Sequence, residues 1–282
     1  MPDTPDTLAE TMQGVRSSDD VVRMVAGVPD GDSWVRLDDA TAVPAIFDGW
    51  FERIRRTIPN GRADVTGAYL ASFLAGAIAT PLVRALVEHE RAWRTTADAA
   101  WVHAHDDGWI DGVAILAPVV VLPGDRAAGR DDVEVVPGIA ELTTIAVRHL
   151  VSLVGPLFAE VRARAPYGLR GMWGTLADSM ASDLTWAAHV DGRDVVAAWR
   201  SVQPALHCLA AAAPRSLTRP TFERVEVDGA IAHLTVRGTC CLYYQSQHTD
   251  APIDYCSSCP MGSEATRRAR RQEWLRRNVA AR

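Results

Sequence analysis

The chain has 282 residues, of which 48% are hydrophobic and 23% charged, and its formal net charge is −6. These values are typical of a soluble globular protein with one large domain or two modest ones. Five cysteines are too few for a secreted scaffold built on disulfides, and the polar, acidic start MPDTPDTLAE does not resemble a secretory signal, so we expect a cytoplasmic protein. All 29 basic residues are arginine, which excludes Schiff-base chemistry and the Walker lysine.

The N-terminal part carries helical patterns. SSDDVVRMVAG predicts a helix over 17–27, with Ser17 or Ser18 as its cap, and a second helix is predicted over 43–58. The uncharged stretch VTGAYLASFLAGAIATPLV, at 19 residues, just reaches the length of about 20 that spans a membrane. Its small and hydroxyl residues favour a buried core helix that continues past Pro81 to Trp93, so we expect no integral membrane segment.

The middle of the chain alternates between hairpin and helix patterns. WVHAHDDGWIDGVAIL predicts a hairpin with its turn at 106–108, and FERVEVDGAIAHLTVRG predicts another with its turn at 228–229. Helices are predicted near 138–164, 170–190 and 192–213. The predicted fold class is therefore α+β, predominantly α-helical, with two small antiparallel β hairpins and a distinct C-terminal segment.

Four of the five cysteines lie in TCCLYYQSQHTDAPIDYCSSCP, residues 239–260. Cys256 and Cys259 form a C-x-x-C turn that can bend over one metal ion, whereas Cys240 and Cys241 are adjacent. Zinc needs four ligands around one ion, usually from two spaced pairs, while a [2Fe–2S] cluster distributes four thiolates over two irons. The spacing favours iron–sulfur over zinc, and unmetallated thiols remain a third possibility.

The string CCLYY, then C-x-x-C-P and an arginine-rich chain end, resembles the FhuF-like ferric-siderophore reductases. In that family the signature C-C-x₁₀-C-x₂-C binds a [2Fe–2S] cluster, which implies Cys240, Cys241, Cys256 and Cys259 as ligands here. The spacer in this chain has 14 residues, four more than the family's. RGMWGTLADSMA, from Arg170, is similar to the family's R-x-x-W-G stretch, with Thr175 where the family has asparagine.

The resemblance covers about residues 60–262 and implies a siderophore-binding domain (61–237) and a [2Fe–2S]-binding segment (238–262). Before these we expect an N-terminal helical segment (1–60), which carries no motif of the family, and after them a basic C-terminal helix (263–282). The resemblance implies an oxidoreductase that passes one electron to chelated Fe³⁺ and so releases Fe²⁺. Because no G-x-G-x-x-G or P-loop motif is present, we expect electrons to come from a ferredoxin or another reductase. The alternatives are a non-catalytic siderophore-binding protein with structural zinc, and an iron–sulfur carrier or sensor.

Other residues have two interpretations each. Arg170 and Trp173 are candidate substrate contacts, or they belong to the packing of a helix start. His103 and His105 form a weak two-ligand signal that favours surface histidines, His248 is a minor alternative ligand, and Cys208 is expected in the core.

The chain end is basic while the rest is acidic. Residues 264–282 hold seven arginines and two glutamates, which leaves the remaining chain at −11 and argues against nucleic acid as a partner of the main surface. The tail arginines are either a docking face for an acidic electron donor or a solvated helix face. They are Arg267, Arg268, Arg270, Arg271, Arg276 and Arg277.

Overall fold

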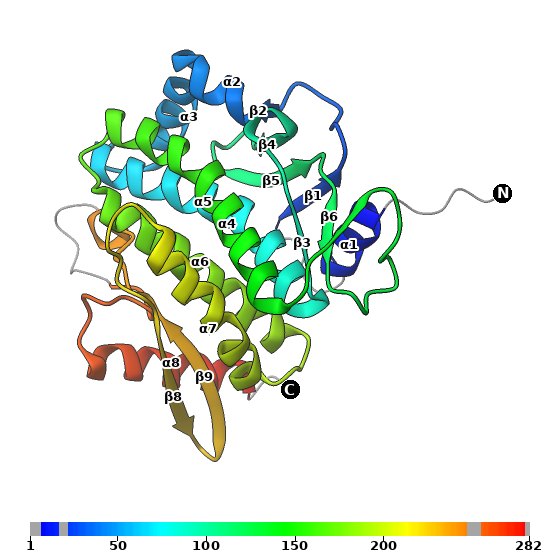
Figure 1. Ribbon diagram of the computed structural model, residues 1–282. Helices are drawn as coiled ribbons and strands as arrows, with labels where there is room; N and C mark the ends of the chain where they lie inside the picture. Colours follow the sequence, from blue (N-terminus) through cyan, green and yellow to red (C-terminus); the bar gives the residue numbers. More distant parts are fainter. Residues whose placement is uncertain (1–6, 17–21, 247–254, 280–282) are drawn as a thin grey trace.

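The computed structural model describes residues 7–16, 22–246 and 255–279. These residues form an α+β fold in which helices dominate (Figure 1), so the predicted fold class is confirmed. The α-helices are α1 (Thr7–Arg16), α2 (Leu37–Ala42), α3 (Pro44–Thr57), α4 (Ala63–His89), α5 (Ile139–Arg164), α6 (Leu169–Val190), α7 (Val195–Ala212) and α8 (Glu264–Val279).

The strands form three small sheets, ordered β1-β5-β4-β2, β3-β6-β7 and β8-β9. Both predicted hairpins are present, as β4–β5 and β8–β9, and the middle sheet adds strands too short to show an alternating pattern. The pairs β1–β5 and β6–β7 are parallel. The strands are β1 (Arg23–Ala26), β2 (Trp34–Arg36), β3 (Arg91–Trp93), β4 (Ala100–Ala104), β5 (Ile110–Ile115), β6 (Val119–Val121), β7 (Val133–Val135), β8 (Thr221–Val227) and β9 (Ala230–Val236).

The N-terminal segment differs from the helical one that we predicted. Within the described part of 17–27, residues 23–26 form strand β1, and Met24, in register with Val113 of β5, is buried. Pairing with a sheet from the middle of the chain overrides the local helical pattern. Since β2 pairs with β4 in the same sheet, the described residues of the N-terminal segment 1–60 are built into the fold that follows them.

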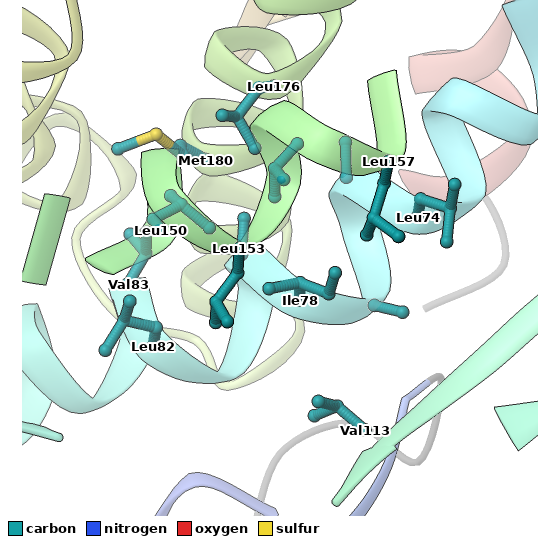
Figure 2. Close-up of a cluster of buried hydrophobic side chains, with 14 of the residues drawn as sticks. Leu74, Ile78, Leu82, Val83, Val113, Leu150, Leu153, Leu157, Leu176 and Met180 are labelled. Atoms are coloured by element: carbon teal, nitrogen blue, oxygen red, sulfur yellow. The ribbon is translucent and has the colours of Figure 1, made fainter. Parts of the chain in front are cut away.

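Helix α4 lies at the centre of the core. Figure 2 shows its side chains Leu74, Ile78 and Leu82 among leucines of α5 and α6, with Val113 of β5 nearby. Pro81 does not end α4, which runs on to His89, short of the predicted Trp93, which lies in β3.

In the described residues two helices are long and apolar enough to span a membrane, α4 and α5. They are 72% and 56% buried over their most apolar windows. Both contribute to the hydrophobic core. This is how the core helices of a soluble protein are placed, and it agrees with the expectation of no membrane segment.

The C-terminal helix α8 packs on the hairpin β8–β9, at the end of the molecule beside α6 and α7 (Figure 1). The hairpin turns through Asp228 (φ 52°) and Gly229 (φ 81°), and two positive φ angles are what a two-residue type I′ turn requires. A small second apolar cluster joins the hairpin to α8, with Val227, Ala232 and Leu275 at its centre. The cysteine segment lies between these two elements in the chain, after strand β9 and before α8.

Candidate functional site

The cysteine segment starts where β9 ends, and its two halves meet there. The backbone N–H of Arg237 donates to the carbonyl of Ser258 at 3.0 Å, which joins the end of β9 to the C-x-x-C turn. Within that turn the Cys259 N–H donates to the carbonyl of Cys256, also at 3.0 Å. Residues 247–254, which include His248, lie outside the described residues.

The structure brings the four predicted cysteines together as two pairs. The Sγ atoms of Cys240 and Cys259 are 4.0 Å apart, and we call these two residues the inner pair because Cys259 is only 2% exposed. Cys241 and Cys256 are hydrogen-bonded through their side chains, and we call them the outer pair because both line a surface hollow. All four are free thiols.

The adjacent cysteines belong to different pairs because the chain turns sharply after them. Leu242 has a φ of 59°, which is unusual for a residue with a branched side chain, and its N–H donates to Cys240 Sγ at 3.4 Å. The hydroxyl of Tyr167 donates to the carbonyl of Cys240 at 3.2 Å. These two hydrogen bonds hold Cys240 at the start of the turn.

The thiols differ in acidity. Burial raises the pKa of Cys240 to about 11. The hydrogen bond between Cys241 and Cys256 raises the pKa of Cys241 and lowers that of Cys256 to about 7, and the charge of Arg237 favours the thiolate of both. The thiolate is the form that binds metal, so Cys256 is more readily available as a ligand near neutral pH than Cys240 or Cys241.

The four cysteine sulfurs are arranged in pairs, and the separation within the inner pair suits two ligands of one metal ion. Two thiolates on one tetrahedral ion, each at about 2.3 Å, lie about 3.8 Å apart, close to the 4.0 Å between Cys240 and Cys259. Over the ranges that the structure describes, no three His, Cys, Asp or Glu side chains form a group with metal-binding geometry. The inner pair therefore offers two ligands at one position, and the outer pair offers two further sulfurs beside the hollow.

Asp178 of α6 anchors the segment and was not singled out from the sequence. Its side chain is 2% exposed and accepts hydrogen bonds from the N–H groups of Gly238 (2.7 Å) and Thr239 (3.1 Å) and from Nε of Arg237 (3.4 Å). Burial raises the pKa of this carboxyl to about 6, against the opposing effect of these donors. One carboxylate thus fixes all three residues before Cys240.

Gly174 lets α6 approach the segment closely. A Cβ atom at this position would lie 1.9 Å from Oγ1 of Thr239, a distance that real atoms do not adopt. Gly174 is the last residue of the RGMWG stretch, which ends against the residue before Cys240. The motif is therefore connected to the cysteines through packing.

The two candidate substrate residues of that stretch are placed differently. Trp173 is 1% exposed and packs edge-to-face on Phe158, with ring centroids 5.2 Å apart. This placement agrees with the interpretation of Trp173 as part of the packing at a helix start. Arg170 is exposed at the start of α6, and its Nη2 donates to Oγ1 of Thr218 at 3.3 Å. Neither residue lines the hollow beside the cysteines.

Two tail arginines hold the C-x-x-C turn from the other side. Arg271 is 2% exposed and donates to the carbonyls of Ser257 (2.9 Å) and Thr235 (2.7 Å) and to Glu223 (3.0 Å). Arg267 donates to the carbonyls of Cys259 (3.4 Å) and Gly262 (2.5 Å) and to Glu223 (3.1 Å).

Both sequence-based interpretations assumed that the tail arginines share one exposed face, either solvated or used for docking. The structure shows that they do not. Arg267 and Arg271 have structural contacts to the cysteine segment. Exposed charges on α8 pair with acids instead: Arg268 with Glu264, Arg276 with Asp228 and Arg277 with Glu273. Such exposed pairs contribute little to stability.

A hollow of about 300 Å³ lies over the outer cysteine pair. It contains two sulfurs, a guanidinium, three aromatic rings and two serine hydroxyls, and it is lined by Tyr69, Ser72, Phe73, Arg237, Cys241, Tyr243, Cys256 and Ser258. A neighbouring hollow of about 450 Å³ shares Ser72 and Phe73 with it and continues along α4 and α6 to Trp109 and Trp186. The two hollows adjoin at α4.

The remaining candidates have structural roles. His103 is buried and its Nδ1 is 2.5 Å from Oδ1 of Asp111, while His105 stacks on Trp109 with centroids 4.4 Å apart. The two histidines thus have separate partners, and the prediction of paired surface histidines is wrong for His103, because its ring is buried against Asp111. Cys208 packs against the core, as expected.

A scan against models of protein families finds no match to this sequence, and a search of curated proteins finds none either. The resemblance to FhuF-like reductases therefore remains a prediction that rests on the cysteine segment and the RGMWG stretch.

Proposed function

We propose that the protein is a one-electron ferric-siderophore reductase that holds a [2Fe–2S] cluster on Cys240, Cys241, Cys256 and Cys259. The observation that carries the proposal is the arrangement of the four thiols as two pairs, one that includes the buried Cys259 and one that lines a hollow. Two thiolates per iron is the ligand count of an all-cysteine [2Fe–2S] cluster, whereas a zinc site gathers four ligands around one ion.

The reaction needs a strong one-electron donor, because oxygen-donor chelators bind Fe³⁺ far more tightly than Fe²⁺. Each tenfold preference for the ferric ion lowers the one-electron potential by about 59 mV. An all-cysteine [2Fe–2S] cluster supplies single electrons at low potential, about −400 mV in plant-type ferredoxins. The reaction needs no acid, base or nucleophile from the protein, since the released Fe²⁺ leaves a chelator that binds it weakly.

The chain's own residues position and shield the sulfurs. Asp178 fixes the approach to Cys240, and Arg271 and Arg267 fix the C-x-x-C turn. Cys259 of the inner pair is kept from water and Cys240 is half-buried, while the outer pair lines the hollow in which a chelate can approach. A substrate there would touch the ligand side chains, which gives a short path for the electron.

The proposal places the protein in the cytoplasm, where thiols stay reduced, and makes a ferredoxin or another reductase the source of electrons. The exposed arginines of α8, Arg268, Arg276 and Arg277, remain the residues that would steer an acidic donor. Association by steering weakens as salt screens the charges, over a Debye length of about 8 Å at physiological ionic strength.

The test begins with anaerobic purification and measurement of iron, acid-labile sulfide, zinc and the visible spectrum. We expect two irons and two sulfides per chain, lost in Cys241→Ser and Cys256→Ser but retained in Cys208→Ser. The reduced protein should then be reoxidised by a ferric siderophore, with Fe²⁺ captured by a ferrous-specific dye.

Three results would count against the proposal. A colourless protein with one zinc per chain would support the structural-zinc alternative. Full iron in Cys256→Ser would contradict the ligand assignment. Equal anaerobic reoxidation by iron-loaded and iron-free siderophore would indicate a carrier or sensor.

A further inference from the structure

The hollow over the outer cysteine pair contains one guanidinium, that of Arg237. Nε of Arg237 donates to Asp178 at 3.4 Å, and its backbone N–H donates to Ser258. The two terminal amino groups have no hydrogen-bond partner among the described residues. The side chain is 19% exposed, so the guanidinium is held in place at its inner end and reaches the hollow at its outer end.

A guanidinium is a planar fork of N–H donors that matches a pair of negatively charged oxygens. Around it stand the hydroxyls of Ser72 and Ser258 and the rings of Tyr69, Phe73 and Tyr243. Pockets of this kind, mainly apolar with a few converging polar groups, bind small molecules in an orientation that the polar groups determine. The combination suits a flat, oxygen-rich and anionic surface.

The electrostatics of the hollow point to the same ligand. Arg237 lines the same hollow as the sulfurs of Cys241 and Cys256. Without Arg237, an anionic chelate would meet the negative charge of the ligand sulfurs directly, and like charges in contact cost several kcal/mol. A fixed positive charge between them reduces this repulsion where the electron has to pass.

We propose that this hollow binds the oxygen shell of the chelate, that Arg237 is its anchoring residue, and that the site prefers anionic chelates. The identity of the ligand as a ferric chelate rests on the proposed function. A volume of about 300 Å³ is at the lower limit for ligand pockets, so the hollow takes the iron end of the chelate. The backbone of the chelator extends into the neighbouring hollow past Ser72 and Phe73.

The test measures binding with chelates that cannot be reduced. Gallium(III) complexes of a trianionic tris-catecholate and of a neutral tris-hydroxamate are titrated by calorimetry into the protein as purified. We expect Arg237→Gln to weaken binding of the trianionic complex by about tenfold to a hundredfold, as for loss of a hydrogen bond to a charged group. The affinity for the neutral complex should fall less in Arg237→Gln. The affinity of Arg237→Lys for the trianionic complex should lie between those of wild type and Arg237→Gln.

Three further variants make the result specific. Arg224→Gln removes an equal charge from an exposed pair with Glu226 on β8 and should leave both affinities unchanged. Ser72→Trp fills the hollow and leaves Arg237 in the chain, and it should weaken both complexes, which keeps the test decisive if Arg237→Gln fails to fold. Arg170→Gln tests the competing candidate from the sequence.

Affinities within twofold of wild type in folded Arg237→Gln, or in Ser72→Trp, would overturn the proposal. The outcome is separable from that of the proposed function, because gallium binding requires no electron transfer. Arg237-dependent gallium binding without iron reduction would uphold the anchor and refute the reductase. Iron reduction with unchanged gallium binding in the variants would refute the anchor alone.

Discussion

Replacing Gly174 by alanine tests whether α6 positions the cysteines. The added Cβ would lie 1.9 Å from Oγ1 of Thr239 and 3.0 Å from its Cβ. Ordinary contacts begin at about 3.5 Å, so the hydroxyl has to retreat by about 1.5 Å. Thr239 cannot retreat freely, because its N–H is hydrogen-bonded to Asp178 and Cys240 follows it directly.

The magnitude follows from two opposing effects. Overpacking of a tight contact costs about 1–3 kcal/mol of unfolding free energy. Alanine in place of glycine inside a helix returns about 1 kcal/mol. We therefore expect Gly174→Ala to lose up to about 2 kcal/mol of stability and, since Cys240 is displaced, to bind less iron and sulfide than wild type.

The assay combines urea unfolding of the apoprotein with iron and sulfide content after anaerobic reconstitution. Gly76→Ala is the control for helix propensity, because nothing lies within 4 Å of its added Cβ, and we expect it to gain up to about 1 kcal/mol. Gly67→Ala is the control for overpacking remote from the cysteines, since its Cβ would lie 2.4 Å from that of Ala165. It should lose stability but keep its iron. If Gly174→Ala matches Gly76→Ala in stability and wild type in iron content, the reasoning is refuted.

Three further predictions concern the surroundings of the cysteines. Arg271→Gln should lose about 2–4 kcal/mol in urea unfolding and most of its iron, because buried bonds to Ser257 and Glu223 disappear, whereas exposed Arg268→Gln should change stability by less than about 1 kcal/mol. The pKa of Asp178 rises from 3.8 in the unfolded chain to about 6 in the folded protein, so between these pH values the folded apoprotein binds more protons than the unfolded chain. Its stability relative to Asp178→Asn should therefore fall as the pH rises from 4 to 6. A difference in unfolding temperature between the two proteins that does not change with pH would contradict this. Removing iron with an acidic chelating buffer should lower the unfolding temperature of wild type but not that of Cys256→Ser, as measured by circular dichroism.

Local patterns predicted most of the secondary structure. The helices α3, α5, α6 and α7 and both hairpins are near their predicted places, because each carries its own signals of periodicity, capping and turn residues. The Asp228-Gly229 turn is the clearest case, since its two positive φ angles are what that dipeptide favours. The strand β1 was mistaken for a helix because its conformation depends on β5, some 90 residues later in the chain.

The sequence by itself determined the cysteines as the candidate ligands, since four soft donors in one short window stand out in a chain with only five. Only the tertiary structure decided how they pair and what surrounds them. Asp178 precedes its partners by about 60 residues, and Arg271 follows Thr235 by 36. Contacts at such separation leave no periodic signal, because they arise from the packing of α6 and α8 on the ends of β9. For the same reason Trp173 turned out to be buried in the core, while Arg237, in no motif, is the arginine in the hollow beside the sulfurs.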